Sequence, residues 1–106
     1  MKIILDLDGT ILDKNGVISS NLLNYFRNKA SSLDVSICTG RFSDSLLEII
    51  EKLNLDDSYH ICDGGGRIID NLGTTIWANE IDLQVIKLAY EIQNQFDIDI
   101  VLSDKG

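Results

Sequence analysis

The fold is decided by residues 2–10, which read KIILDLDGT. Apart from Asp6, the run from Ile3 to Leu7 is aliphatic, which is typical of a parallel strand covered on both faces. Asp8 follows two residues after Asp6, and Gly9 then allows the backbone to turn sharply. This stretch therefore predicts a buried first strand with two carboxylates at its carboxyl end.

Outward from this strand, the apolar spacing predicts an alternation of strands and helices. The expected elements are a helix entered at Ser19, Ser20 or Asn21 and reaching Ala30, a strand over 33–38, a helix entered near Ser43 and running over 45–53, a strand over 59–63, a hairpin of 67–70 and 74–77, a helix from Asp82 to Phe96, and a strand at Ile98, Ile100 and Leu102. Ser45 and Glu48 have the spacing of a capping box. The order predicts an α/β fold with a parallel sheet, right-handed crossovers, and ligands at the carboxyl ends of its strands.

The two aspartates after the first strand need a compensating charge. Desolvated like charges raise each other's pKa, so Asp6 and Asp8 require a cation or a shared proton. A hard divalent ion such as Mg²⁺, which prefers oxygen ligands, satisfies this requirement. A carboxylate can also attack phosphorus, while Gly9 leaves amides facing an anion and the Thr10 hydroxyl caps or orients.

A second polar cluster follows the next expected strand. Thr39 offers a hydroxyl, Gly40 permits close approach, and Arg41 precedes a helix N-terminus, a combination that suits an anion. Taken singly, each cluster has a purely structural interpretation as a polar strand exit or a helix entrance. Because both follow neighbouring parallel strands, we expect them to meet, one holding a phosphoryl group and the other supplying a nucleophile and a metal site.

Composition limits the partners. The formal net charge is −8 and the basic residues do not cluster, which argues against nucleic acid. There is no apolar run of about 18 residues, so we expect a cytoplasmic chain without membrane contact. Cys38 and Cys62 are interpreted as small buried thiols, and His60 stands without a second histidine for a metal site.

These motifs resemble a known family. Asp6 to Thr10 is similar to motif I of the haloacid dehalogenase superfamily, and Thr39 to Arg41 is similar to its motif II. Residues 61–70, followed by Gly73, resemble the Asn-Gly-Ala hairpin of the Cof-type branch, which includes sugar-phosphate phosphatases. Gly64 stands where that branch usually has asparagine, so that side chain's ligand contact is absent.

The resemblance implies roles for the site residues. Asp6 would be the nucleophile and a magnesium ligand, and Asp8 the general acid and base with its main-chain carbonyl on the metal. Thr39 and the Gly40 amide would hold the phosphoryl group, with Arg41 nearby. Gly9 and Thr10 complete the expected substrate-binding loop, and the implied partner is a small phosphorylated metabolite.

The resemblance also divides the chain. Residues 1–80 would be the N-terminal half of a three-layer Rossmann-like core with its hairpin, and 81–106 the start of an inserted cap. Alternatively, the last helix and strand complete the core beside the first strand, with Lys87 and Asp104 replacing the family's lysine and acidic cluster, neither of which is recognised. Otherwise the first strand has an open edge, which we expect a second copy or the final strand to cover.

The leading functional hypothesis is a magnesium-dependent phosphomonoester hydrolase that uses an aspartyl-phosphate and is incomplete in this chain. Whether the chain is itself an enzyme stays open at this point. The alternatives are a non-catalytic domain that binds phosphate and magnesium or mediates an interaction, and, less in keeping with the aspartate spacing, a phosphoryl-accepting signalling domain.

Overall fold

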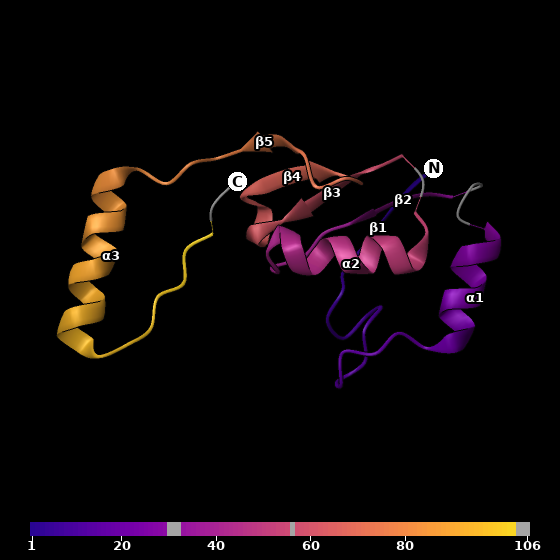
Figure 1. Cartoon of the computed structure of the whole chain (residues 1–106), viewed down its shortest axis with the longest axis horizontal. Helices are drawn as coiled ribbons and strands as arrows, with labels where there is room; N and C mark the ends of the chain where they lie inside the picture. The colour runs from indigo at the N-terminus through magenta and orange to yellow at the C-terminus, as the bar shows by residue number, and fades with distance from the viewer. Residues whose placement is uncertain (30–32, 56, 104–106) are drawn as a thin grey trace.

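The computed structural model describes residues 1–29, 33–55 and 57–103 and shows an α/β fold (Figure 1). Its elements are β1 (Lys2–Leu5), α1 (Ser20–Lys29), β2 (Asp34–Ile37), α2 (Ser43–Leu53), β3 (Tyr59–Cys62), the short 3-10 turn η2 (Asp63–Gly65), β4 (Arg67–Asp70), β5 (Thr75–Ala78) and α3 (Leu83–Phe96). The strand and helix order expected from the apolar spacing is therefore confirmed as far as α3.

The first three strands run parallel. β1 pairs with β2 from Lys2 opposite Asp34 to Leu5 opposite Ile37. Beyond β2, the Thr39 amide donates to the Ile61 carbonyl at 2.9 Å, which brings β3 alongside in parallel. β4 and β5 then add antiparallel strands in the order β3-β4-β5. The carboxyl ends of β1 and β2 thus lie side by side, as expected.

The helices α1 and α2 contact each other, and α1 stands beside the end of α2 at the edge of this helical layer (Figure 1). The apolar stripe of α2 is buried in the core at helical spacing, in the order Leu46, Ile49, Ile50 and Leu53. α1 packs less extensively, because Phe26 alone is buried among the residues of this helix. The sheet and this helical layer together form the truncated core that the sequence predicted.

The entrances of the two helices differ from each other. The Ser19 hydroxyl accepts from the Leu22 amide at 3.2 Å, which confirms a serine cap for α1. The capping box predicted for Ser45 and Glu48 is wrong, because α2 already begins at Ser43 and is entered from Phe42 without a side-chain cap. Glu48 instead pairs with Lys52 on the exposed side of the helix, at 2.8 Å.

The glycine run separates β3 from β4. Gly64 and Gly65 adopt φ values of 64° and 99°, which confirms that this turn needs left-handed backbone. At the far end of the hairpin, Asp70 Oδ1 accepts from the Leu72 and Thr74 amides, both at 2.9 Å. The hairpin is therefore fixed at both ends by local chemistry.

The last part of the chain departs from expectation. α3 begins after Asp82, whose carboxylate accepts from the Gln84 amide at 3.0 Å, and it stands apart from the sheet (Figure 1). The predicted strand at Ile98–Leu102 is wrong, because residues 98–103 form no strand and pair with none of the strands in the described part of the chain. Lys87, on α3, is accordingly not beside β1, and Asp104 lies outside the described residues. The division at residue 80 stays a prediction.

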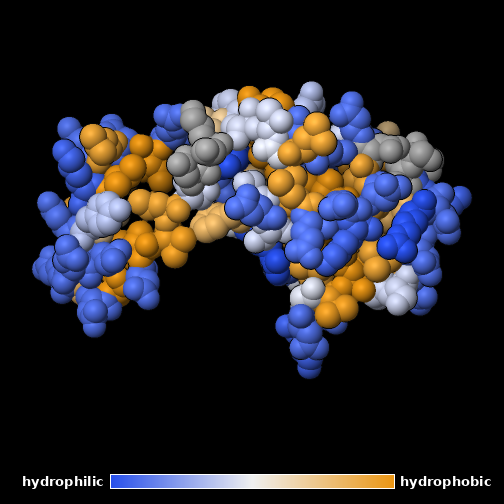
Figure 2. Space-filling model, viewed as in Figure 1, coloured by the Kyte–Doolittle hydropathy of each residue, from blue (hydrophilic) through white to orange (hydrophobic). Residues whose placement is uncertain are grey.

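α3 leaves much apolar surface exposed. None of its residues is buried, and Leu83 and Phe96 are each 62% exposed. Figure 2 shows exposed apolar residues on this helix, mainly on the side turned toward the rest of the chain, with hydrophilic residues along its outer rim. Within the described part of the chain, no helix has both the length and the apolar character needed to cross a membrane.

Candidate functional site

A tight loop positions the two aspartates after β1. The carbonyl of Leu7 accepts from the amides of Thr10, Ile11 and Leu12 at 2.9–3.1 Å, and Leu7 itself is fully buried. Gly9 turns the chain with φ of 78°. The buried Leu7 therefore anchors a loop from which the neighbouring acidic side chains face solvent.

The second cluster is held by β3 and its turn. Thr39 is buried, and its hydroxyl accepts from the Arg41 amide at 3.1 Å. The Gly64 amide donates to the Thr39 carbonyl at 3.2 Å, and the Asp63 amide donates to the Arg41 carbonyl at 2.9 Å. A Cβ added to Gly40 would meet nothing within 4 Å, so this side of the backbone is open to a ligand.

The two clusters meet through one ion pair. Arg41 donates from Nε to Asp8 Oδ2 at 2.9 Å and from Nη2 to Asp8 Oδ1 at 2.6 Å. These hydrogen bonds from the guanidinium lower the pKa of Asp8, and the carboxylate raises the pKa of Arg41. Asp8 and Arg41, 33 residues apart in sequence, therefore share one site at the carboxyl ends of β1 and β2.

Asp6 and Thr10 are close in sequence to Asp8 but make no contact with the ion pair of Asp8 and Arg41. Asp6 Oδ1 accepts from the Leu7 amide at 2.9 Å, and its other carboxylate oxygen makes no hydrogen bond or ion pair with the described residues. The Thr10 side chain is exposed and likewise makes no side-chain bond within that part of the chain. Asp6 is thus available to a ligand.

The donor set suits part of a magnesium shell. Asp6 supplies carboxylate oxygens, the ligand type that Mg²⁺ prefers, and the Asp8 main chain supplies a carbonyl oxygen, while the Asp8 carboxylate is held by Arg41. Over residues 1–29, 33–55 and 57–103, no group of three His, Cys, Asp or Glu side chains is close enough to hold a metal ion. The fit is therefore chemical and partial, with waters and other groups required to complete the shell.

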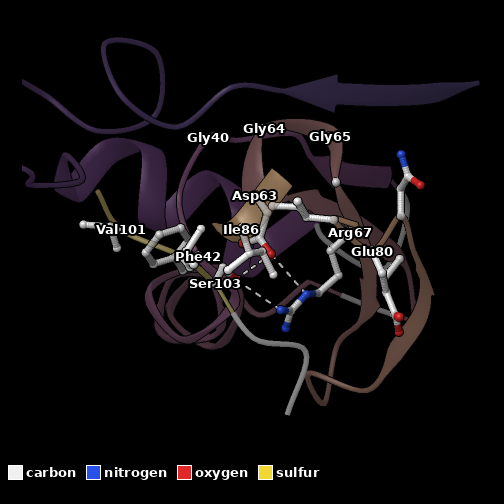
Figure 3. A pocket seen from close by; sticks show the side chains of 15 residues that line it. Gly40, Phe42, Asp63, Gly64, Gly65, Arg67, Glu80, Ile86, Val101 and Ser103 are labelled. Atoms are coloured by element: carbon white, nitrogen blue, oxygen red, sulfur yellow. Dashed lines mark hydrogen bonds and ion pairs between the residues drawn. The ribbon is translucent and has the colours of Figure 1, made fainter. Parts of the chain in front are cut away.

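Sequence reasoning missed a third polar cluster, which lies beside the other two. Arg67 is buried and its Nε lies 3.1 Å from Asp63 Oδ2. Ser103 joins them, accepting from Arg67 Nη2 at 3.1 Å and donating to Asp63 Oδ2 at 2.8 Å. Figure 3 shows this pair inside a cleft of about 980 Å³ that also includes Gly40. The glycine run was its only sequence signal, because Arg67 occupies an ordinary strand position.

Comparisons with known proteins agree with this geometry. The family described as haloacid dehalogenase-like hydrolase matches residues 3–106. Among curated proteins, none matches the sequence significantly.

Solved structures share the fold. A haloacid dehalogenase-like hydrolase from Bacteroides thetaiotaomicron has a TM-score of 0.79 at 21% identity, with 89% of this chain and 37% of that chain covered. A phosphatase of the haloalkanoate enzyme superfamily from the same organism has a TM-score of 0.73 at 26% identity, covering 91% and 35%. A haloacid dehalogenase-like hydrolase from B. subtilis has a TM-score of 0.68 at 29% identity, covering 91% and 33%.

The chain spans about a third of the length of these structures. The family model matches residues 3–106, which is nearly the whole chain. The chain therefore belongs to the haloacid dehalogenase-like hydrolase family.

Proposed function

We propose that this chain supplies the nucleophile half of a magnesium-dependent phosphomonoester phosphatase. The observation that carries the proposal is the ion pair of Asp8 with Arg41, since it joins the two motifs where a phosphoryl group would sit. The superfamily phosphatase from B. thetaiotaomicron, 26% identical, supports the choice of phosphate ester among the hydrolase substrates. The expected cytoplasmic location stays a prediction.

The proposed first half-reaction uses both aspartates. A carboxylate oxygen of Asp6 attacks phosphorus while the bond from phosphorus to the leaving oxygen breaks, and Asp8 gives that oxygen a proton. The product is an alcohol and an aspartyl-phosphate at Asp6. The Thr39 hydroxyl and the Gly40 amide hold the phosphoryl oxygens during this transfer.

In the second half-reaction, water attacks the same phosphorus. Asp8, now a carboxylate, takes a proton from the water, and the bond from phosphorus to Asp6 breaks to release phosphate. Magnesium, held by Asp6 and Asp8 together with water, would neutralise charge on the phosphoryl oxygens.

Arg41 links the protonation of Asp8 to ligand binding. Its guanidinium lowers the pKa of Asp8, which favours the ionised carboxylate and makes it a weaker base. To donate a proton to the leaving oxygen, however, Asp8 must first be protonated. An incoming phosphate dianion attracts Arg41 away from Asp8, so Asp8 gains a proton more easily when substrate is present.

The test is magnesium-dependent phosphate release by the purified chain from a panel of small phosphomonoesters. We expect Asp6→Asn to abolish release and Asp97→Asn to preserve it. The two variants make the same chemical change, but Asp97 lies at the end of α3 with φ of 49°, a backbone that asparagine also tolerates. Equal activity of the wild type and Asp6→Asn would contradict the proposed nucleophile.

Binding measurements on the same purified chain decide the alternative. If the chain releases no phosphate but binds inorganic phosphate and Mg²⁺ through residues 6–10 and 39–41, it is a non-catalytic phosphate-binding domain. In the described residues, no lysine pairs with either aspartate, so compensating charge beyond Arg41 would have to come from elsewhere.

A further inference from the structure

The turn between β3 and β4 holds the backbone of the candidate phosphoryl-binding loop, residues 39–41. The Gly64 amide donates to the Thr39 carbonyl at 3.2 Å, and the Asp63 amide donates to the Arg41 carbonyl at 2.9 Å. One turn therefore fixes the carbonyls at both ends of this loop.

This attachment decides where the Gly40 amide points. The carbonyl of Thr39 and the N–H of Gly40 belong to one peptide group, and in a planar trans peptide these two bonds point in opposite directions. Because the Thr39 carbonyl is directed at the turn, the Gly40 N–H is directed away from it. In the described part of the chain this N–H has no acceptor, and a Cβ added to Gly40 would meet nothing within 4 Å. The amide is therefore available to an anion.

The turn is strained and needs support of its own. Asp63 has φ of 53°, a left-handed backbone that residues with side chains rarely adopt, and Gly64 and Gly65 follow at 64° and 99°. Such conformations persist only where the surrounding structure fixes them. At Asp63 the side chain provides the support, since Oδ2 lies 3.1 Å from Arg67 Nε and accepts from the Ser103 hydroxyl at 2.8 Å.

Arg67 also connects this turn to the helix that follows the loop. The residue is only 4% exposed, and Figure 3 shows its guanidinium directed at Asp63 and Ser103. Its Nη1 donates to the hydroxyl of Ser43, the first residue of α2, at 3.3 Å. The loop thus lies between two segments, the turn and the start of α2, that one buried side chain holds together.

We propose that Arg67 is a positioning residue of the phosphoryl site, which fixes the turn and thereby orients the Gly40 amide toward a phosphoryl oxygen. Arg67 acts through the backbone, since its guanidinium is buried in an ion pair with Asp63. The exposed Arg41 differs from it, because Arg41 pairs directly with Asp8. The inference rests on the proposed function, in which this loop holds the phosphoryl group.

The test is binding of inorganic phosphate, with Mg²⁺ present, to the whole 106-residue chain, followed by amide NMR. Arg67→Lys keeps the net charge but loses the planar fork that reaches several partners. Asp63→Asn tolerates the left-handed backbone and removes one negative charge. Each variant should weaken phosphate binding at least about tenfold, the change expected when one hydrogen bond to a charged group is misaligned. Each should also speed hydrogen exchange of the Gly64 amide.

The two variants separate positioning from charge. A purely electrostatic effect would leave phosphate affinity unchanged in Arg67→Lys and raise it in Asp63→Asn, and that result would overturn the proposal. Leu53→Ala is the control for lost stability, because Leu53 is fully buried at the other end of α2. It should preserve phosphate affinity, and a loss as large as that of Arg67→Lys would make Arg67 a structural residue only.

The outcomes also separate this inference from the proposed function. If the wild type and both variants bind phosphate equally well, positioning by Arg67 is refuted and the phosphate site stands. If the wild type binds no phosphate, the proposed function fails, and the ligand role of the loop fails with it. Exchange of the Gly64 amide needs no ligand, so unchanged exchange in the variants would still show that Arg67 does not hold the loop. Should Arg67→Lys not fold, Asp63→Asn gives the same decision.

Discussion

At the scale of single residues, the guanidinium of Arg41 favours the ionised form of Asp8. Its two hydrogen bonds lower the pKa of that carboxyl. We expect Arg41→Leu to raise the pKa of Asp8 toward the ordinary value for aspartate, because the charged form loses its partner. The measurement is a carboxyl ¹³C titration of Asp8 with and without the substitution.

A second ion pair provides the control for that titration. Lys52 lies 2.8 Å from Glu48 and lowers the pKa of Glu48 in the same way. Lys52→Leu should therefore raise the pKa of Glu48 and leave Asp8 unchanged. An Asp8 pKa that does not respond to Arg41→Leu would show that the ion pair does not persist in solution.

His60 makes the fold sensitive to acid. The imidazole is fully buried, and burial lowers its pKa, with the bond to Asn71 opposing this. Nδ1 accepts from the Ile37 amide at 3.1 Å, so a proton there would face another donor. The folded state thus prefers the neutral ring. The stability that the neutral ring contributes is complete above the unfolded pKa of about 6.5 and is lost as the pH falls below that value.

Unfolding by urea at pH 7.5 and pH 5.5 measures this effect. The wild type should lose at most about 1.4 kcal/mol for each pH unit below the unfolded pKa, the limit for one proton. His60→Gln, the control, lacks the titrating ring and should lose less over the same interval. His60 is the only histidine in the sequence, so an equal loss in both proteins would assign the acid sensitivity to carboxylates.

Local residue chemistry was the most predictable part of this chain. The aspartate loop, the glycine turn and the serine cap each need particular backbone angles or side-chain oxygens, and such needs are visible in sequence. The partner that a side chain contacts in the fold is not visible in the local sequence. Nothing local distinguishes Arg67 from an ordinary strand residue, because its partners Asp63 and Ser103 are brought to it by the glycine turn and by a segment 36 residues further along.

At the scale of elements, α2 and α3 have similar apolar patterns but different surroundings. Leu46 on α2 is fully buried, whereas Leu88 on α3 is 54% exposed. We expect Leu46→Ala to lower the free energy of unfolding by about 2–5 kcal/mol, because it leaves a cavity in the core. Leu88→Ala should change it by less than about 0.5 kcal/mol, since it removes no packing against the sheet.

Fluorescence of Trp77 during urea unfolding suits this comparison, because Trp77 lies on β5 and is the only tryptophan. A loss for Leu88→Ala as large as that for Leu46→Ala would mean that α3 packs against the rest of the protein in solution.

Periodicity predicted both helices because each repeats apolar residues every three or four positions. It did not reveal which stripe would be covered, since that depends on what packs against it. The predicted strand at Ile98–Leu102 failed for the same reason. Alternation of apolar and polar residues makes a segment suitable for a sheet. A strand forms, however, only beside another strand with free hydrogen-bonding groups.

At the scale of the whole molecule, α3 makes the chain extended. The radius of gyration is 16.2 Å, whereas a compact domain of about 100 residues has roughly 13 Å. The core from β1 to β5 is held together by its sheet and helical layer, and the chain runs out to α3 and returns to Ser103 (Figure 1). The candidate site belongs to the compact part. The meeting of its two motifs was expected from the parallel strands, whereas the ion pair of Asp8 with Arg41 and the cleft were not predicted.

The free side of β1 is the remaining open feature of that compact part. In the described residues β1 pairs with β2 alone, and Ile4 on it is 57% exposed. An unpaired apolar edge favours association with another strand. Residues 98–103 do not supply one, since Ser103 is held at Asp63, so we propose that a second copy of the chain pairs there.

Sedimentation at increasing protein concentration tests this pairing. The wild type should form dimers, and Ile4→Lys should shift the equilibrium toward monomer because a charged side chain at a strand edge opposes edge-to-edge pairing. Val17→Lys is the matched control, since Val17 is equally exposed at 56% but lies in the loop before α1, and it should leave the dimer intact. Hydrogen exchange gives an independent reading, because pairing protects the outward amides of β1. A monomer at all concentrations whose β1 amides exchange rapidly would refute the pairing and leave the edge to solvent.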